Sequence, residues 1–319
     1  MKNKKFWKYF REYKVSQIVA MIKNGSKDPL TCTTRFDEKL VVITGATSGI
    51  GKFTAIKYAS MGADLLCVNR NEEKSIKLKN EIESKYQVKC DSIIADLGDV
   101  DQIYSVAEQL SNLSKSIDVL IHNAGIYLSK QQLTKEGLDL VFVVNYLSSF
   151  IINYHLIDKL KSQSKARIIL NNSEGHRFAV WGLKLDDLNF SKTRYSGLKA
   201  YGSAKLAQLL SMLIFKEKFT GSNVTINAMH PGAVHSDTGK ENGKIYKWFK
   251  NNWLAKFLRS TEIASEALYY LGVSPNLEGV SGKFFSLTTQ EIPAPPAWDM
   301  DEARKIWELS LKYTNQERT

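Results

Sequence analysis

Apolar residues in this chain fall into short runs that are separated by longer stretches with helical periodicity. The runs at residues 40–43 (Leu-Val-Val-Ile) and 118–121 (Asp-Val-Leu-Ile) do not alternate with polar residues, which is typical of strands buried on both faces of a parallel sheet. Runs of this kind predict seven strands, at residues 40–43, 65–68, 92–94, 118–121, 167–171, 224–229 and 283–286. With right-handed crossovers between them, they predict an α/β fold with a doubly wound, seven-stranded parallel sheet and helices on both faces.

Two segments lie outside this alternating pattern. Residues 1–36 precede the first strand and are rich in basic and aromatic side chains, whereas residues 291–319 begin at a proline cluster and continue into a short helical pattern. We therefore divide the chain into an N-terminal extension (1–36), a central domain (37–290) and a C-terminal tail (291–319). The tail carries Trp307, which we expect to pack back onto the domain because a free tail gains nothing from large apolar groups.

A glycine-rich loop follows the first predicted strand. Residues 44–51 read Thr-Gly-Ala-Thr-Ser-Gly-Ile-Gly and lead into a helical pattern. Glycines allow close approach of the backbone to a pyrophosphate, and the start of a helix offers free N–H groups to an anion. This order predicts a Rossmann-type dinucleotide-binding domain, although a glycine turn of this kind also occurs without a ligand. The residues expected to contact the cofactor are Gly45, Thr47, Ser48, Gly49, Ile50 and Gly51.

The end of the second predicted strand indicates which cofactor is bound. Asn69 and Arg70 stand about 20 residues after the glycine loop, where an NAD enzyme carries an acidic residue for the ribose 2′-hydroxyl. The guanidinium of an arginine instead makes paired, charged hydrogen bonds to a 2′-phosphate. Arg70 therefore favours NADP(H), the alternative being a solvated arginine at a strand end.

Three further motifs follow at strand ends and in a helical stretch: Asp96-Leu97, Asn123-Ala124-Gly125 and Tyr201-Gly202-Ser203-Ala204-Lys205. Together with the glycine loop, their order and spacing resemble the short-chain dehydrogenase/reductase family over about residues 38–290. The resemblance implies that Asp96 and Leu97 meet the adenine and that Asn123, Ala124 and Gly125 support the cofactor cleft. It also implies that Pro231 and Gly232 lead to a nicotinamide contact near Val234, and that Asn145, Ser173, Tyr201 and Lys205 form a catalytic tetrad.

The chemistry of tyrosine and lysine supports part of this tetrad independently. A spacing of four places Tyr201 and Lys205 on one face of a helix. A phenol has a reference pKa of about 10, and proton transfer near neutral pH needs this value lowered by roughly 2 to 3 pH units. One lysine ammonium about 4 to 6 Å away supplies the required free energy of about 3 to 4 kcal/mol. Without the glycine loop, an ordinary surface pair would be the better interpretation.

The other two members of the tetrad depend more on the resemblance. Ser173 follows the fifth predicted strand at its carboxyl end, where open α/β sheets bind ligands, so its hydroxyl could hold a substrate oxygen. A serine after a strand is otherwise a turn residue. Asn145 lies in a helical run and could orient a water that relays protons to Lys205; the alternative is a buried asparagine satisfied by the backbone.

A long insert, residues 175–200, separates Ser173 from Tyr201. With Gly51-Lys52, His230-Pro231-Gly232 and Ser236, it resembles the retinol dehydrogenase and WW-domain oxidoreductase branch, whose members favour NADP(H) and hydrophobic alcohols, aldehydes or ketones. The chain departs from this branch at His122, at Ser148-Ser149 and at Asn171-Asn172. Aromatic residues at 235–260 add the expectation of a large apolar pocket or lid, without identifying the substrate.

Charge and composition restrict the partners. The net charge of +11 lies mainly in residues 1–27 (eight Lys/Arg, one Glu) and 240–259 (six Lys/Arg, one Glu). Such patches suit an anionic membrane surface, although the N-terminal aromatics could instead pack against the body or a second subunit, as in a homo-oligomer. The aromatic and aliphatic faces of residues 6–22 do not coincide, so one continuous amphipathic helix is not expected there.

Other features exclude several classes of protein. No stretch approaches the roughly 18 consecutive apolar residues of a membrane span, and no secretory signal is present, so we expect a cytoplasmic protein with at most peripheral membrane contact. The three cysteines, Cys32, Cys67 and Cys90, are expected to be buried and free. No metal site is expected, because the histidines are scattered. Nucleic-acid binding has charge in its favour but no recognition motif.

These patterns together predict an NADP(H)-dependent oxidoreductase that interconverts a hydrophobic alcohol and its aldehyde or ketone, with Tyr201 as the general acid/base. The alternative is a non-catalytic NADP(H)-binding sensor or scaffold. A sensor needs the glycine loop but has no need of Tyr201 and Lys205, so the complete tetrad favours the enzyme.

Overall fold

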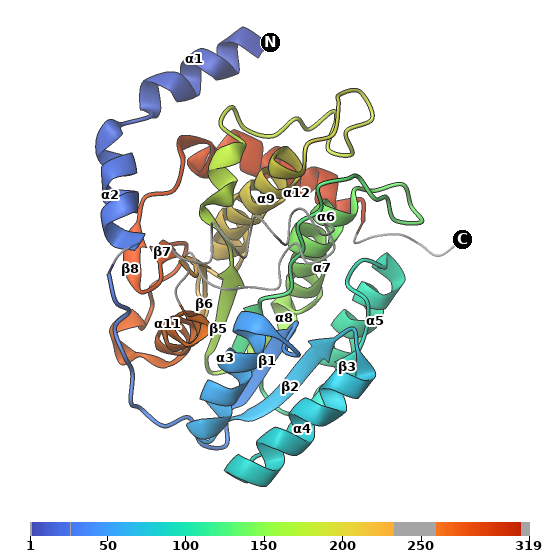
Figure 1. Ribbon diagram of the computed structural model, residues 1–319, viewed down its shortest axis with the longest axis vertical. Coiled ribbons are helices and arrows are strands. Elements are labelled where there is room, and N and C mark those ends of the chain that lie inside the picture. Colours follow the sequence, from blue (N-terminus) through green and yellow to red (C-terminus); the bar gives the residue numbers. More distant parts are fainter. Residues whose placement is uncertain (1, 26, 233–259, 314–319) are drawn as a thin grey trace.

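The apolar runs of the sequence form one sheet in the computed structural model, which describes residues 2–25, 27–232 and 260–313. Its strands are β1 (Leu40–Thr44), β2 (Asp64–Asn69), β3 (Cys90–Ile94), β4 (Val119–His122), β5 (Ala166–Asn171), β6 (Val224–His230), β7 (Phe284–Ser286) and β8 (Thr289–Glu291). Their order across the sheet is β3-β2-β1-β4-β5-β6-β7-β8 (Figure 1). The first seven are parallel and coincide with the seven predicted strands, so the doubly wound α/β fold is confirmed.

The predicted count of seven strands missed β8, which pairs antiparallel with β7. Only Leu287 and Thr288 separate Ser286 from Thr289 in this hairpin, and Leu287 takes a φ of 54°. Tight hairpins of this kind usually carry glycine or asparagine at such a position. The turn therefore had no recognisable signal in the sequence.

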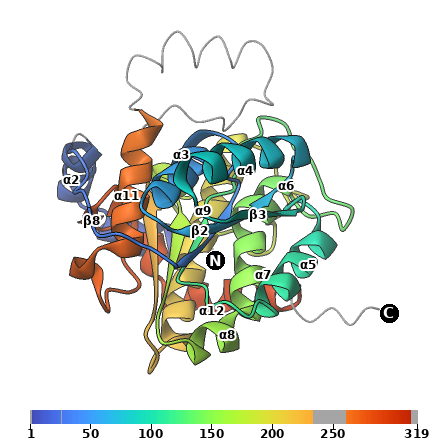
Figure 2. The ribbon, with the colours of Figure 1, turned by 90° about the horizontal axis from the view of Figure 1, so that it is seen from below.

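Helices cover both faces of the sheet (Figure 2). The first face carries α3 (Gly49–Ser60), α4 (Glu72–Tyr86) and α11 (Thr261–Val273). The second carries α5 (Val100–Ser111), α6 (Leu140–Phe142), α7 (Ser148–His155), α8 (Ile157–Ser162) and α9 (Gly197–Lys218), and α12 (Met300–Leu311) packs on α9. Within β1, Leu40 and Val42 enter one core while Val41 and Ile43 enter the other. The central strands β1 and β4 are apolar along most of their length because both of their faces are buried.

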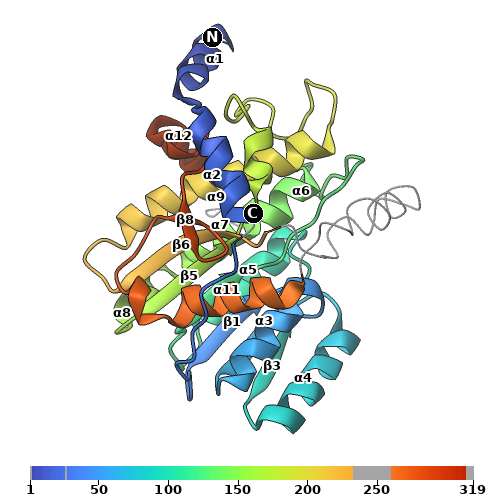
Figure 3. The ribbon, with the colours of Figure 1, turned by 60° about the vertical axis from the view of Figure 1, so that its left-hand side comes forward.

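The N-terminal extension forms two helices, α1 (Lys2–Glu12) and α2 (Val15–Gly25), so the expectation that no single helix spans this region is confirmed. Figure 3 shows α2 beside β8. Tyr9 on α1 is fully buried, and its ring packs against Gly182 in the insert after Ser173. The extension is thus attached to the body of the protein.

The C-terminal tail packs onto the second face of the sheet. The ring of Trp307 on α12 lies 4.9 Å from the ring of Phe150 and 4.8 Å from that of Phe215, measured between centroids, and is buried. The predicted packing of Trp307 is therefore confirmed. The three cysteines are buried and free, as expected.

Candidate active site

The loops that leave the carboxyl ends of β1, β2, β4 and β5 hold most of the predicted site residues. In a doubly wound sheet this edge is the place where ligands bind, because the strand order reverses there. In this molecule the reversal lies between β1 and β4.

The glycine loop has the geometry of an anion-binding turn. Gly45 takes a φ of 71°, and a Cβ atom on Gly51 would lie 2.1 Å from the Gly45 carbonyl oxygen, so neither position accepts a side chain. α3 begins at Gly49, and its N-cap residue Ser48 makes no side-chain hydrogen bond to the helix. The Ser48 side chain therefore satisfies none of the first N–H groups of α3, and the positive end of the helix dipole favours an anion at this position.

Asn69 and Arg70 extend this site at the end of β2. The Asn69 side-chain oxygen accepts a hydrogen bond of 2.8 Å from the Ala46 N–H. Its Nδ2 is buried and has no hydrogen-bond partner among the described residues. A buried amide donor without a partner is costly, so it is suited to a ligand oxygen. Arg70 is exposed directly after it.

Asn123 joins the carboxyl ends of three strands, β1, β4 and β5. Its Nδ2 donates to the carbonyl oxygens of Thr44 and Gly45 at 3.1 and 2.9 Å, and its Oδ1 accepts from Nδ2 of Asn171 at 2.9 Å. The Ala124 N–H donates to Oγ1 of Thr44. Sequence reasoning treated Asn171 only as a departure from a subgroup pattern, but it links β5 to the glycine loop.

The predicted adenine contacts differ from each other in exposure. The Asp96 carboxylate is half-buried and accepts a 2.8 Å hydrogen bond from the Gly98 N–H. Leu97 is buried in the core of the second face. An adenine contact by either residue stays a prediction.

Lys205 and Tyr201 lie on the same face of α9, as their spacing predicts. The Lys205 Nζ lies 5.8 Å from the centroid of the Tyr201 ring and donates a 2.8 Å hydrogen bond to the Asn171 carbonyl oxygen. Burial lowers the pKa of Lys205 to about 7. Because nearby negative charge favours the ammonium form, a bound polyanion would raise the pKa of this group.

Ser173 is brought to Tyr201 by the turn that follows it, η2 (Glu174–Phe178). The Ser173 Oγ accepts a 3.0 Å hydrogen bond from the Gly175 N–H. A Cβ atom on Gly175 would lie 2.5 Å from the Tyr201 ring, so the absence of a side chain lets the turn and the ring pack together. Since Oγ already accepts a hydrogen bond, its O–H remains to be donated.

Asn145 lies in η1 (Val143–Leu147), a π-helical segment before α7. Its Nδ2 donates to the carbonyl oxygens of Ile126 and Val141, and its Oδ1 accepts from the Ile126 N–H. The side chain thus holds the loop after β4, as in the alternative interpretation of a backbone-satisfied asparagine. A water relay through this residue stays a prediction.

The remaining predicted contacts lie at the edge of the described structure. Gly232 takes a φ of 78° and ends the second described stretch together with Pro231. Val234, Ser236 and the basic, aromatic residues at 240–259 lie outside the described residues.

The residues that depart from the pattern of the retinol dehydrogenase branch make hydrogen bonds inside the protein. Nε2 of His122 lies 2.8 Å from the Asn153 oxygen, and burial lowers the pKa of His122 to about 4. The hydroxyls of Ser148 and Ser149 donate to helix carbonyls, and Nδ2 of Asn172 donates to the Lys205 carbonyl. Each of these side chains therefore has a hydrogen-bond partner within the protein, and that of Asn172 is the backbone of Lys205.

Several residues near Ser173 and Tyr201 had no signal in the sequence. The Tyr127 ring meets the Tyr201 ring edge-on, with 6.0 Å between centroids. Glu174 pairs with Arg177, which also binds Glu291 at 3.2 Å. Burial raises the pKa of Glu174 to about 7, although the charge of Arg177 lowers it.

Comparison with known proteins agrees with this geometry. Residues 39–182 match the family model described as short chain dehydrogenase. The chain is 32% identical to retinol dehydrogenase 13 of Homo sapiens over 286 residues, covering 88% of this chain and 85% of that protein. It is 31% identical to the WW domain-containing oxidoreductase of Pongo abelii, covering 88% and 69%.

Solved structures give the same result for the fold. A crystal structure of an uncharacterised protein from Mycobacterium paratuberculosis superposes with a TM-score of 0.69 and 25% identity, over 91% of this chain and 97% of that one. The resemblance to the retinol dehydrogenase and WW-domain oxidoreductase branch is thereby confirmed. The chain belongs to the short-chain dehydrogenase family of oxidoreductases.

Proposed function

We propose that this protein is an NADP(H)-dependent oxidoreductase that interconverts a hydrophobic alcohol and its aldehyde or ketone. The observation that carries the proposal is the arrangement of Ser173, Tyr201 and Lys205 at the carboxyl end of β5: Gly175, two residues after Ser173, packs on the Tyr201 ring, and Lys205 Nζ lies 5.8 Å from that ring and binds the Asn171 carbonyl oxygen. Bound NADP(H) would supply the hydride, and the protein's own residues handle the substrate oxygen and the proton.

Each side chain has a distinct role in carbonyl reduction. Ser173 donates its free O–H to the substrate oxygen, because the Gly175 N–H already occupies an acceptor site on Oγ. The Tyr201 hydroxyl gives its proton to the same oxygen. Lys205, when protonated, stabilises the tyrosinate that results, and alcohol oxidation reverses each step.

The cofactor preference follows from the end of β2. Arg70 and the unpartnered Nδ2 of Asn69 are both donors, and no acidic side chain occupies positions 69 or 70. A 2′-phosphate would gain charged hydrogen bonds from Arg70, which a 2′-hydroxyl cannot match.

A hydrophobic substrate fits the surface of the insert after Ser173. Phe178, Trp181 and Leu198 are exposed there, and the Trp181 ring lies 6.4 Å from that of Tyr13 on α1. The names of the retinol dehydrogenase relatives point to an alcohol substrate of this kind. Exposed aromatic and aliphatic groups near a catalytic loop favour apolar ligands.

A screen of hydrophobic aldehydes and ketones tests the proposal, with NADPH consumption as the readout. Wild-type protein should oxidise NADPH with at least one member of a panel that includes nonanal, benzaldehyde and all-trans-retinal, and Tyr201→Phe should not. NADPH binding without turnover on the whole panel would favour the non-catalytic sensor instead.

We also propose that the N-terminal extension contacts an anionic membrane surface. Val15, Val19 and Ile22 form an exposed apolar face on α2, with exposed fractions of 77, 56 and 67%. Trp7 and Phe10 on α1 are also exposed. Basic and apolar side chains together suit the headgroup region. No helix among the described residues is long and apolar enough to cross a membrane.

Another part of the extension packs against the body of the protein, as in the alternative interpretation of its aromatic residues. Tyr9 packs into the body, and Lys5 and Lys8 bind Glu302 and Asp299. Cosedimentation with anionic and neutral vesicles at low and high salt separates the two contributions. Binding should require anionic lipid and should weaken when Val19 is replaced by aspartate; indifference to lipid charge and salt contradicts the proposal.

A further inference from the structure

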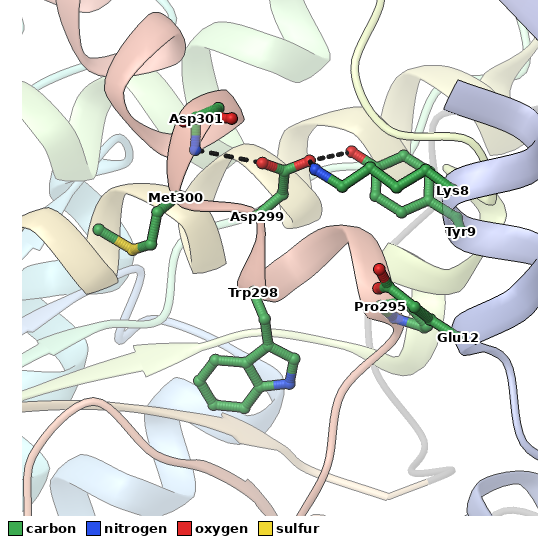
Figure 4. A pocket seen from close by; sticks show the side chains of 8 residues that line it. All are labelled: Lys8, Tyr9, Glu12, Pro295, Trp298, Asp299, Met300 and Asp301. Carbon is green, nitrogen blue, oxygen red and sulfur yellow. Dashed lines mark hydrogen bonds and ion pairs between the residues drawn. The ribbon is translucent and has the colours of Figure 1, made fainter. Parts of the chain in front are cut away.

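The chain from Ile292 to Asp299 connects β8 to α12, and we call it the proline strap because it holds three of the six prolines. Its end is fixed to α1: Asp299 Oδ2 accepts hydrogen bonds of 2.7 Å from Lys8 Nζ and 2.6 Å from the Tyr9 hydroxyl (Figure 4). A cavity of about 260 Å³ beside this contact is lined by Lys8, Tyr9, Glu12, Pro295, Trp298, Asp299, Met300 and Asp301. The end of the strap is thus attached to α1, which holds none of the candidate catalytic residues.

The middle of the strap reaches η2 through His176. Nε2 of His176 accepts a 3.0 Å hydrogen bond from the Ala294 N–H, and Nδ1 lies 2.7 Å from the Ser173 carbonyl oxygen. The ring is fully buried and meets the Phe284 ring edge-on. Arg177 makes a second contact between η2 and the strap, because its guanidinium donates a hydrogen bond to the Ile292 carbonyl oxygen.

These two contacts select one tautomer of His176. A backbone N–H only donates, so Nε2 must be unprotonated. A neutral imidazole then carries its hydrogen on Nδ1, which donates to the Ser173 carbonyl. Burial lowers the pKa of His176 to about 3, so the ring stays neutral at any pH suitable for an assay.

Ser173 is therefore held at each of its backbone polar atoms. Its N–H donates to the Asn172 Oδ1, and its carbonyl oxygen accepts from the N–H and from Nδ1 of His176. Its Oγ accepts from the Gly175 N–H. A rotation of this backbone would move the hydroxyl away from Tyr201, whose ring packs on Gly175.

We propose that His176 is a positioning residue through which the proline strap sets the orientation of the Ser173 hydroxyl. The inference rests on the proposed oxidoreductase function. The Ala294 N–H fixes the tautomer, the tautomer supplies the donor to the Ser173 carbonyl, and this donor holds the serine in place. The chain segments near both termini thereby influence turnover without touching the cofactor.

Ala294→Pro tests the first link, because it replaces the N–H that donates to Nε2 with a ring carbon that cannot donate, at a residue whose φ of −57° already suits proline. Its matched control, Ala294→Gly, keeps the N–H. The ¹⁵N shifts of the His176 ring in protein with NADPH alone should show the Nδ1–H tautomer in wild type and Ala294→Gly, and a mixture in Ala294→Pro. With nonanal and NADPH, kcat should fall about tenfold in Ala294→Pro only, and KM for NADPH should change less than twofold.

Two replacements of His176 separate its hydrogen bonds. In His176→Asn the amide nitrogen stands near the Nδ1 position and can still donate to Ser173, whereas in His176→Gln the amide oxygen stands near Nε2 and can only replace the strap contact. We expect kcat within about threefold of wild type for His176→Asn and at least tenfold lower for His176→Gln. This pair decides the proposal if circular dichroism shows that Ala294→Pro is unfolded.

An unchanged tautomer in folded Ala294→Pro overturns the proposal. Equal kcat in the asparagine and glutamine variants, or a loss that falls on KM for NADPH, overturns it too. Failure of the proposed function is distinguishable, because wild type would then show no turnover while the ¹⁵N measurement would still report the tautomer.

Discussion

The half of the sheet that carries the glycine loop and the half that carries Ser173 are stabilised by different kinds of contact. Around the glycine loop the partners are neighbouring strand ends, such as the amides of Asn69 and Asn123. Around Ser173 the direct partners are local, but one of them, His176, depends on a residue far along the chain: it binds Ala294, and the strap that contains Ala294 ends at Asp299, which binds Tyr9. The contacts between strand ends form together with the sheet. The contacts that hold His176 also require that the strap and α1 pack onto the body of the protein.

This difference indicates that cofactor affinity and the positioning of the substrate oxygen are separable properties. A change on the glycine-loop half should act on cofactor binding, and a change on the Ser173 half should act on turnover. The following predictions test that separation.

The largest expected effect is on turnover. Tyr201→Phe removes the hydroxyl that transfers the proton, and we expect turnover of any active carbonyl substrate to fall at least about 100-fold. NADPH affinity, measured by fluorescence titration, should stay within a few-fold of wild type. Tyr104→Phe on α5 is the matched control, because the Tyr104 hydroxyl has no hydrogen-bond partner among the described residues. Near-normal turnover in Tyr201→Phe would exclude the proton role.

The second prediction concerns the glycine-loop half alone. Arg70 should favour NADP(H) over NAD(H) by roughly 2 to 3 kcal/mol through charged hydrogen bonds to the 2′-phosphate. Arg70→Ala should remove most of this preference without lowering kcat at saturating NADPH. Arg304→Ala, which removes an exposed arginine of α12, is the control for net charge. Equal affinities for the two cofactors in wild type would refute the assignment.

The glycine-loop half could be predicted from the sequence because its function depends on short motifs. Gly45 and Asn123 lie near each other in the fold for reasons visible in the sequence: each follows a strand formed by an apolar run, and parallel strands bring their carboxyl ends to one edge. The pattern Tyr201 to Lys205 is likewise local, since the helix period alone places both side chains on one face.

The other half contains relationships that no local pattern encodes. His176 is one of five scattered histidines in the sequence, and its role depends on a backbone N–H 118 residues away. β8 was missed because its turn uses Leu287 at a positive φ. The contact between the proline cluster and η2 joins residues that are adjacent only in the folded chain, as Ala294 and His176 are.

A third prediction uses the titration of Lys205, which lies between the two halves. The pKa of Lys205 is lowered to about 7 by burial, against about 10.4 in an unfolded chain. Between these values the unfolded chain binds a proton that the native protein lacks, so the free energy of unfolding rises with pH. In protein prepared without cofactor, wild type should gain roughly 2 kcal/mol relative to Lys205→Met between pH 7 and 9.

Urea unfolding of both proteins at several pH values measures this difference. Saturating NADPH should shrink it, because the negative charge of the cofactor raises the pKa of the lysine. Parallel stability curves for the two proteins without cofactor would show that Lys205 is not the titrating group.

The smallest expected effect lies farthest from the cofactor. Tyr9→Phe removes the 2.6 Å hydrogen bond to Asp299, while Lys8 and the N–H groups of Asp301 and Glu302 still bind that carboxylate. Hydrogen bonds to charged groups contribute about 1.5 to 3 kcal/mol when their loss leaves the charge unpaired. Because most partners remain, we expect a loss of only about 1 kcal/mol in the free energy of unfolding, with unchanged NADPH affinity.

Tyr13→Phe is the matched control on the same side of the molecule, since its hydroxyl makes a longer, 3.3 Å hydrogen bond to the neutral Val180 carbonyl. Tyr13→Phe should lower the free energy of unfolding by less than half as much as Tyr9→Phe.

The pH dependence of stability gives a second test. Burial alone would raise the pKa of Asp299, but the hydrogen bonds from Lys8 and Tyr9 outweigh burial and lower it. A carboxylate with a lowered pKa contributes stability above its unfolded value and loses it as the pH falls. The difference in the free energy of unfolding between wild type and Tyr9→Phe should therefore narrow below about pH 4. A difference that is constant with pH would mean that the Tyr9 hydroxyl does not act through the Asp299 carboxylate.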